Sequence, residues 1–463
     1  MKQQHLTLLG AACALALDGC GSLVPATDKP APPLREGFRV AEAPVDLPAD
    51  RAHEWDGFFA DRRLREVVGI ALQQNRSLRA SAAAVERVRA QYRIAEADRI
   101  PDLNAGASAT RQRAASGATT TSYGVNLGLA SYEIDLFNRL ASLEGAALAR
   151  YLAQQETQRS ARLSLVAEVT NAWLTLAAEQ QRLALAQQLR DSQQRTLALT
   201  EERYRLGAVA GLERARARTA FEAARGEAAR ALGAVTQARL QLELLAGQPL
   251  PDTLLPAAQD LEPVTALPAL PGGLPAEVLL QRPDLRAAEQ QLQAAAFDVG
   301  AARAARFPRL TLTASAGTRS PELDGLFKSG SGVWSLLPQL DLPLFDGGAR
   351  AAQVDASQAS RRQALASYEA ALQSAFREVA DALAVRDGLA ERLDAQQAQV
   401  AAAAQSLRLA EDSYRLGGSS QLELLDAQRQ LASAQQGLVT LRQTEQANRV
   451  TLLRALGGRW SGG

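Results

Sequence analysis

Residues 411–434 read EDSYRLGGSSQLELLDAQRQLASA, and residues 201–224 read EERYRLGAVAGLERARARTAFEAA. Both stretches place Tyr-Arg-Leu-Gly at the same point, 210 positions apart, within long runs of helix formers. A glycine that follows such a run commonly ends a helix, because it adopts the left-handed conformation at little cost. Each stretch therefore predicts a turn between two helices, and the chain contains this turn twice.

The repeat extends far beyond the turn, because short segments match at a nearly constant spacing of 207 to 210 residues. The matches are Leu78-Arg79-Ala80 with Leu285-Arg286-Ala287, Arg99-Ile100-Pro101 with Arg306-Phe307-Pro308, Leu136-Phe137-Asn138 with Leu344-Phe345-Asp346, and Glu168-Val169 with Glu378-Val379. A spacing that hardly changes over so many residues indicates that one structural unit has been duplicated.

The duplication and the proline-rich stretches divide the chain into six parts. These are a signal peptide at 1–19, a lipidated extended tether at 20–50, a first repeat at 51–247, a Pro-rich connector at 248–281, a second repeat at 282–457 and a C-terminal tail at 458–463. Each repeat is predicted to contain a helix, two strands, a very long helix and a returning helix. The fold class is therefore mainly α with a small β part.

The first helix of each repeat is expected at about Leu64–Arg99 and Asp284–Arg306, and Pro101 or Pro308 stops it. Apolar residues then alternate with small or polar ones, with strands expected at about 101–112 and 121–137, and at 308–319 and 332–345. This alternation is typical of a membrane β-strand. Half-buried strands of a soluble sheet fit the same pattern.

Asn138 and Asp346 occupy the positions where an N-cap of the long helix is expected. From there the chain runs to Leu206 or Leu416 without a proline, which at ~1.5 Å per residue gives a helix of roughly 100 Å. Such a helix indicates a coiled coil, a rod or a tube. The return helices are expected at Leu212–Ala246 and Leu422–Leu456.

Four strands cannot close a barrel, and an open sheet edge facing lipid would leave backbone groups unpaired. Membrane strands would therefore require association of several chains. Three chains give twelve strands, which is wide enough for a lumen, whereas two give eight strands and a filled interior.

Composition argues against an enzyme and against nucleic acid as a partner. The formal charge is +1, so the chain has no basic bias towards polyanions. The only cysteines are Cys13 and Cys20, and the only histidines are His5 and His53. A zinc centre, a Ser-His-Asp triad and a Cys-His pair are therefore excluded, and no cofactor is expected.

The N-terminus resembles a secretory signal, with Lys2 followed by an apolar stretch from Leu6 to Leu17. Leu17-Asp18-Gly19-Cys20 is similar to a bacterial lipobox, although Asp18 stands where a small or apolar residue is usual. An N-acyl chain (palmitate) and an S-diacylglycerol are expected on Cys20, with ordinary cleavage near Ala12–Ala16 as the alternative. Gly21 follows Cys20, and the absence of aspartate there favours the outer membrane.

Several segments together resemble the outer membrane efflux proteins, the TolC-like outer membrane factors, in the lipoprotein branch that serves RND-type efflux systems. The matching segments are Trp55-Asp56-Gly57-Phe58-Phe59, Arg282-Pro283-Asp284-Leu285-Arg286-Ala287-Ala288-Glu289, Phe307-Pro308, Leu344-Phe345-Asp346-Gly347-Gly348 and both Tyr-Arg-Leu-Gly turns. The resemblance covers essentially all of the mature chain.

The resemblance implies a homotrimer whose twelve strands form one outer-membrane β-barrel, continued by an α-helical barrel in the periplasm. The protein would be a passive exit duct for drugs or toxic organics, a role associated with multidrug resistance. Its partners would be a periplasmic adaptor, an inner-membrane pump of RND type and outer-membrane lipid. The alternatives are the outer-membrane component of a type I protein secretion system, and a soluble periplasmic coiled-coil scaffold.

The resemblance also assigns roles to residues of the two turns. Acidic residues after the second turn would narrow the periplasmic aperture, and they fall at Glu423 and Asp426. Ser420 and Glu423 also form a capping-box pattern, so Glu423 has a purely structural alternative. Glu213 matches Glu423, but Arg216 stands opposite Asp426, which makes an Asp426–Arg216 contact between adjacent hairpins an option.

Tyr204 and Tyr414 precede the turns, and the resemblance makes Tyr414 and Glu213 a candidate pair that holds the tunnel shut. Aromatic packing in the last helical turn is the alternative. The residues expected to contact the adaptor are Gly207, Gly211, Gly417, Gly418 and Ser419.

Overall fold

The computed structural model describes residues 23–26, 37–38, 58–257, 264–265 and 274–458. Cys20, the signal peptide and most of the tether lie outside the described residues. The chain forms two compact units. The first combines residues 1–32, 83–156 and 286–371, and the second combines residues 33–82, 157–285 and 372–463.

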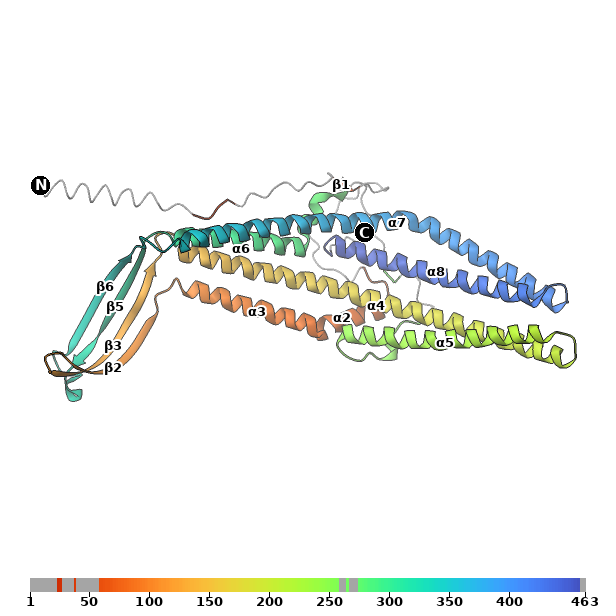
Figure 1. Cartoon of the computed structure of the whole chain (residues 1–463), viewed down its shortest axis with the longest axis horizontal. Coiled ribbons are helices and arrows are strands. Elements are labelled where there is room, and N and C mark those ends of the chain that lie inside the picture. The colour runs from red at the N-terminus through yellow and green to blue at the C-terminus, as the bar shows by residue number, and fades with distance from the viewer. Residues whose placement is uncertain (1–22, 27–36, 39–57, 258–263, 266–273, 459–463) are drawn as a thin grey trace. The chain divides into compact units, whose positions relative to one another are not determined.

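Both repeats contain a helix, two strands, a very long helix and a returning helix in the same order (Figure 1), and the first repeat begins with one additional helix. The first repeat contains α2 (Arg62–Gln74), α3 (Arg76–Ala97), β2 (Leu103–Arg113), β3 (Thr119–Ile134), α4 (Arg139–Arg205) and α5 (Gly211–Ala246). The second contains α6 (Pro283–Ala304), β5 (Arg309–Ser320), β6 (Gly332–Asp341), α7 (Ala349–Arg415) and α8 (Gln421–Ala455). The predicted duplicated fold class is confirmed. A short sheet of β1 (Gly37–Phe38) and β4 (Leu274–Pro275) lies outside this pattern.

The four long strands form one antiparallel sheet in the order β2-β3-β5-β6, within the first unit. The pairing of β3 with β5 shifts between Leu129 and Tyr132, where Ser131 has a φ of 51°. β6 ends at Asp341, earlier than the expected 345, because Pro343 has no N–H to continue a ladder. β2 and β6 are the two edges of the sheet, and each has one side without a partner in the described chain.

Two details differ from the sequence-based expectations, and a third agrees with them. The helix expected from Leu64 to Arg99 is two helices, because Asn75 takes an extended conformation and its side-chain oxygen accepts a hydrogen bond from the N–H of Leu78 (2.9 Å). Asn138 has a φ of 58° and does not supply the cap; the Asp135 carboxylate accepts the Ala141 N–H instead (2.8 Å). Asp346 does cap α7, accepting from Gly348 and Arg350.

The second unit has a large apolar core around Trp173 of α4, whose side chain is fully buried. Its indole N–H donates to the carbonyl oxygen of Leu254 (3.4 Å), and the Arg63 guanidinium lies 5.8 Å from the ring centroid. Phe58 and Leu64 pack in the same cluster. No helix among the described residues combines the length and apolarity needed to cross a membrane.

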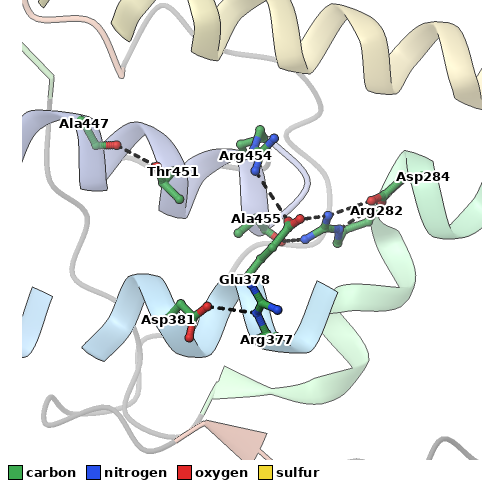
Figure 2. A network of polar contacts seen from close by, with 9 residues as sticks. All are labelled: Arg282, Asp284, Arg377, Glu378, Asp381, Ala447, Thr451, Arg454 and Ala455. Carbon is green, nitrogen blue, oxygen red and sulfur yellow. Dashed lines mark hydrogen bonds and ion pairs between the residues drawn. The ribbon is translucent and has the colours of Figure 1, made fainter. Parts of the chain in front are cut away.

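A buried arginine holds the end of α8 in the second unit (Figure 2). The Arg282 guanidinium donates to the Ala455 carbonyl oxygen (2.9 Å), to Glu378 (2.9 Å) and to both carboxylate oxygens of Asp284 (3.0 and 2.7 Å). The Arg454 side chain also reaches Glu378 (3.8 Å). The network joins the start of α6, the middle of α7 and the end of α8.

The first repeat makes the equivalent contact with a neutral side chain. Asn75 precedes Arg282 by 207 residues, and its side-chain N–H donates to the Leu245 carbonyl oxygen (2.9 Å), at the matching end of α5. Glu168, the counterpart of Glu378, is exposed. The contact is therefore kept at the same position in both repeats, but an asparagine makes it in the first repeat and an arginine makes it in the second.

The hydrogen-bond network of Arg282 in the second repeat is expected to weaken in acid. Burial, the largest single influence, raises the pKa of Asp284, but the hydrogen bonds and charge of Arg282 outweigh it and hold that pKa below its ordinary value of 3.8. Stability from this carboxylate is therefore complete above pH 3.8 and is lost as the pH falls through the lowered pKa. The free energies of unfolding of Asp284→Asn and of the parent protein, measured from pH 2 to 6, check this. The difference between the two is expected to shrink at the acid end of the range.

Candidate functional site at the hairpin tips

The first tip joins α4 to α5 through a left-handed glycine. α4 ends at Arg205, and Gly207 has a φ of 75°. The N–H of Ala208 donates to the Arg203 carbonyl (2.8 Å), and the N–H of Gly207 donates to the Tyr204 carbonyl (3.0 Å). These bonds satisfy the last carbonyls of the helix, so the Tyr-Arg-Leu-Gly motif is a helix stop.

The second tip repeats this geometry. Gly417 has a φ of 81°, and its N–H donates to the Tyr414 carbonyl (3.2 Å). The N–H of Gly418 donates to the Ser413 carbonyl (2.8 Å), and the Ser419 hydroxyl donates to the Ala410 carbonyl (3.4 Å). The glycines of the two tips thus have a conformational role in the single chain, whatever they contact in an assembly.

The two return helices begin differently. α8 has a capping box, in which the Ser420 hydroxyl accepts the Glu423 N–H (3.3 Å) and the Glu423 carboxylate accepts the Ser420 N–H (2.9 Å). α5 begins after Ala210, which has no side-chain oxygen to offer. Glu213 therefore has no equivalent of the box, and only Glu423 is held in place by it.

Asp426 finds its partners on its own helix. The side-chain amide of Gln430 donates to its carboxylate (2.7 Å), and Arg429 lies 3.9 Å away. Its side chain is more than half exposed. A contact with Arg216 remains a prediction for neighbouring hairpins of an assembly.

The two tyrosines, although equivalent in sequence, occupy different environments. Tyr204 is 42% exposed and lies against Arg214, whose guanidinium is 5.2 Å from the ring centroid. Tyr414 is 7% exposed and packs against Arg203 at 5.0 Å, so it joins the α7–α8 hairpin to α4. Its hydroxyl is buried and has no hydrogen-bond partner among the described residues.

Four leucines at the tips were not identified as functional by the sequence analysis. Leu206 and Leu416 are 75% and 87% exposed, and Leu212 and Leu422 are more than half exposed. The sequence does contain an indication of them, because Leu206 and Leu212 recur as Leu416 and Leu422 at the repeat spacing of 210. Each tip thus presents two solvent-facing leucines.

A buried polar seam joins α4 to α8 behind the tips. The Gln421 amide donates to Thr200 (3.4 Å), the Gln193 amide donates to Gln428 (2.7 Å), and the Gln428 amide donates to Ser192 (3.1 Å). The side-chain oxygens of Gln193 and Gln421 are buried without a partner among the described residues. Within the α4–α5 hairpin, by contrast, small apolar residues make the contact: Ala186, Ala228 and Ala231.

No part of the described chain offers a metal site, since no group of three or more His, Cys, Asp or Glu side chains is arranged to hold an ion. The candidate site therefore consists of helix turns, exposed leucines and a few charged side chains.

Comparison with known proteins gives the same picture of two repeats. Residues 67–248 and 274–458 both match the family model described as outer membrane efflux protein, and the two matched segments begin 207 residues apart, at 67 and 274. The chain is 41% identical over 457 residues to the outer membrane protein OprJ of Pseudomonas aeruginosa, which covers 97% of this chain and 95% of the relative.

A second relative and a solved structure extend the comparison. The toluene efflux pump outer membrane protein TtgF of Pseudomonas putida is 40% identical, covering 99% of this chain and 98% of the relative. The open-state crystal structure of the Neisseria gonorrhoeae MtrE outer membrane channel has a TM-score of 0.84 and 38% identity, covering 94% of this chain and 98% of that one.

Proposed function

Because the chain belongs to the outer membrane efflux protein family, we propose that it is the trimeric outer-membrane duct of a tripartite efflux system. The observation that carries this proposal is the four-stranded sheet. One face bears exposed apolar side chains, among them Trp334 (80% exposed) and Leu340 of β6 and Leu127 of β3. Neither edge of the sheet has a partner strand among the described residues. Such a sheet suits lipid on one face and further copies of itself at both edges.

Three copies supply twelve strands, which close without leaving an edge. The 67-residue helices α4 and α7, at ~1.5 Å per residue, are long enough to carry a helical tunnel roughly 100 Å into the periplasm. The duct does no chemistry, and energy comes from the pump at the inner membrane.

The tips are proposed to meet a periplasmic adaptor, which in turn joins an inner-membrane pump of RND type. The exposed leucines Leu206, Leu212, Leu416 and Leu422 support this, because exposed apolar side chains that gather on one part of a surface are typical of a protein-interaction site. The left-handed glycines beside them keep the turns free of side chains, so an adaptor can approach the backbone closely.

A lipid anchor on Cys20 is proposed for the N-terminus. Support comes from residues 23–26, which lie against α6 and α7 of the first unit. The Arg303 guanidinium donates to the Leu23 carbonyl (3.1 Å), and that of Arg361 donates to the Ala26 carbonyl (2.6 Å). A side chain on Gly300 would come within 2.6 Å of Val24, so this glycine leaves room for the segment.

Small organic molecules are the proposed substrate class. The name of TtgF connects that relative with toluene, and it covers nearly the whole of this chain. No residue of the described chain is proposed as a specific substrate site, because an exit duct passes what its pump delivers.

Asp426 is proposed to lie at the periplasmic aperture, where threefold symmetry would place three carboxylates around one axis. Such a ring attracts cations and repels anions. Asp426→Ala is expected to raise single-channel conductance in planar bilayers and to reduce cation selectivity. Glu423→Gln, which keeps a side-chain acceptor for the Ser420 N–H, tests separately whether the second acidic residue contributes to the aperture. Unchanged conductance and selectivity in Asp426→Ala would show that this residue is structural.

The proposal as a whole is tested by the mass and length of the protein extracted from outer membranes in detergent. A three-copy particle with an axis well over ~100 Å, the reach of one long helix, is expected. A monomeric protein recovered in aqueous buffer without detergent would contradict the duct and favour a periplasmic scaffold.

A further inference from the structure

The two faces of the four-stranded sheet carry different charges. Residues that pair directly across neighbouring strands point to the same face, so the pairing assigns each strand residue to one face. Leu127, Leu336 and Leu340 lie on the apolar face. Four charged residues of the strands lie on the opposite face: Glu133, Arg309, Arg319 and Asp341. The four strands place two charged residues on the apolar face, Arg111 and Arg113 of β2.

Both arginines lie at the end of the apolar face that is far from the long helices. Ala105 of β2 pairs with Leu127 of β3 on this face. Every second residue from Ala105 onward faces the same way, and the series ends at Arg111 and Arg113. β2 then turns into β3, whereas α4 follows the other end of β3 (Figure 1). Because the long helices are proposed to lie in the periplasm, the arginines belong to the extracellular end.

The height of Arg111 on the sheet matches the level of lipid head groups. Arg111 lies six rows of paired residues beyond the row of Leu340, which is ~40 Å along the strands at ~3.3 Å per residue. With a strand tilt of about 40°, this is roughly 30 Å across the membrane, just beyond an apolar band of about 25 Å. An arginine that faces lipid is strongly destabilising at the middle of this band and is tolerated at its edge.

The surroundings of the two arginines offer hydroxyl groups and no negative charge. Three hydroxyl side chains share the apolar face beside them: Thr119, Thr121 and Tyr123. The turn between β5 and β6 at the same end of the sheet contains Glu322 and Asp324, and Asp324 pairs with Lys328 (2.8 Å). Within the described part of the chain, neither Arg111 nor Arg113 forms an ion pair with a carboxylate. Both guanidinium groups are therefore available to an external anion.

We propose that Arg111 and Arg113, together with the hydroxyls of Thr119 and Thr121, bind the phosphate groups of a glycolipid in the outer leaflet of the outer membrane. This inference rests on the proposed membrane barrel and adds a lipid partner and its binding site. A guanidinium binds a phosphate through two parallel N–H···O bonds, and a threonine hydroxyl donates a further one. The two arginines are two residues apart on one face, ~6.6 Å at Cα, so both reach the phosphates of one lipid.

The apolar rows below the arginines favour a lipid over a soluble anion. Ala109 and Tyr123 form the row next to Arg111, and Leu127 lies two rows further down. A lipid gains from both parts of the surface, because its phosphates meet the guanidinium groups while its acyl chains cover these rows. The arginine stems lie along the same rows and reach the head groups with their charged ends. Binding here fixes the depth of the sheet in the membrane.

Binding of a glycolipid to the purified three-copy particle in detergent tests the site. The two probes are a glycolipid that carries two phosphates and the same glycolipid with both phosphates removed. The parent protein is expected to bind the phosphorylated probe more tightly, with up to three lipids per particle by native mass spectrometry. Arg111→Gln and Arg113→Gln are each expected to weaken this binding about fivefold, and the double variant roughly twentyfold, because each arginine adds attraction to an anionic lipid surface.

Arg319→Gln is the matched control for the single variants. Arg319 is exposed near the same end of the sheet, but it points to the opposite face, and its replacement changes the net charge by the same amount. This variant is expected to bind the phosphorylated probe as the parent does. If Arg319→Gln weakens binding as much as Arg111→Gln, unspecific charge attraction accounts for the binding and the proposed site is wrong.

The outcomes separate the lipid site from the proposed duct. The parent protein alone decides the first, because equal binding of the two probes by a three-copy particle overturns the site and leaves the duct intact. Displacement of the lipid by an equal concentration of inorganic phosphate would assign the arginines to a soluble anion and overturn the lipid proposal. A protein that is monomeric in aqueous buffer without detergent overturns the duct, and with it the membrane level on which the site depends.

Discussion

Replacing Arg282 with alanine is expected to lower the free energy of unfolding by about 3 kcal/mol, as for removal of one partner from a buried ion pair. The side chain of Arg282 is nearly buried and makes four hydrogen bonds. Its loss leaves the Ala455 carbonyl without this donor, Asp284 without its cation, and Glu378 with Arg454 alone at 3.8 Å. Both carboxylates keep some contact with water, which limits the effect. Denaturant unfolding in detergent, followed by helical circular dichroism, measures it.

Arg377→Ala is the matched control, since Figure 2 shows this arginine one residue before Glu378 on the same helix. Arg377 pairs with Asp381 in an exposed ion pair, and its loss is expected to change the free energy of unfolding by less than about 0.5 kcal/mol. If Arg282→Ala and Arg377→Ala lower the free energy of unfolding equally, the Arg282 network contributes no more than an exposed ion pair.

Gly247→Ala is expected to destabilise the chain by about 3 kcal/mol or more, for two reasons that add. Gly247 ends α5 with a φ of 78°, and an L-residue there costs about 1–2 kcal/mol. A Cβ at this position would also lie 2.4 Å from the carbonyl oxygen of Gln74, so backbone would have to move, at a further cost of about 1–3 kcal/mol. The variant's denaturation midpoint measures the sum.

The duplication supplies the control for this prediction. Gly457 ends the second repeat at the equivalent position with a φ of 80°, but its Cβ would lie 3.4 Å from Arg282, which is close but tolerable. Gly457→Ala is therefore expected to cost only the conformational part, about 1–2 kcal/mol. If Gly247→Ala and Gly457→Ala lower the free energy of unfolding by the same amount, the close approach of Gln74 has no effect on stability and the prediction for Gly247 is wrong.

The sequence was sufficient to predict what local chemistry and periodicity determine. Proline and glycine positions gave the turns, and the repeat spacing gave two copies of one unit. The capping box of Ser420 and Glu423 is observed as its pattern indicates. Asp346 caps α7, since a carboxylate beside a helix start needs no distant partner.

Other features depend on packing and could not be read from the sequence. Tyr204 and Tyr414 stand in the same motif, yet one is exposed and the other buried, because only Tyr414 faces a second hairpin. The break at Asn75 depends on the Leu245 carbonyl, 170 residues away. Arg282 was part of a recognised motif, but its partner at Ala455 lies at the far end of the repeat.

The polar seam between α4 and α8 has a consequence for the temperature dependence of any motion that parts these helices. Separation there hydrates amides and hydroxyls, such as those of Gln193, Gln428 and Thr200, which lie buried in the seam. Hydration of apolar surface raises heat capacity and hydration of polar surface lowers it, so this separation carries a small heat-capacity change. Its free energy is therefore expected to vary nearly linearly with temperature. Unfolding of the core around Trp173, by contrast, follows a strongly curved profile.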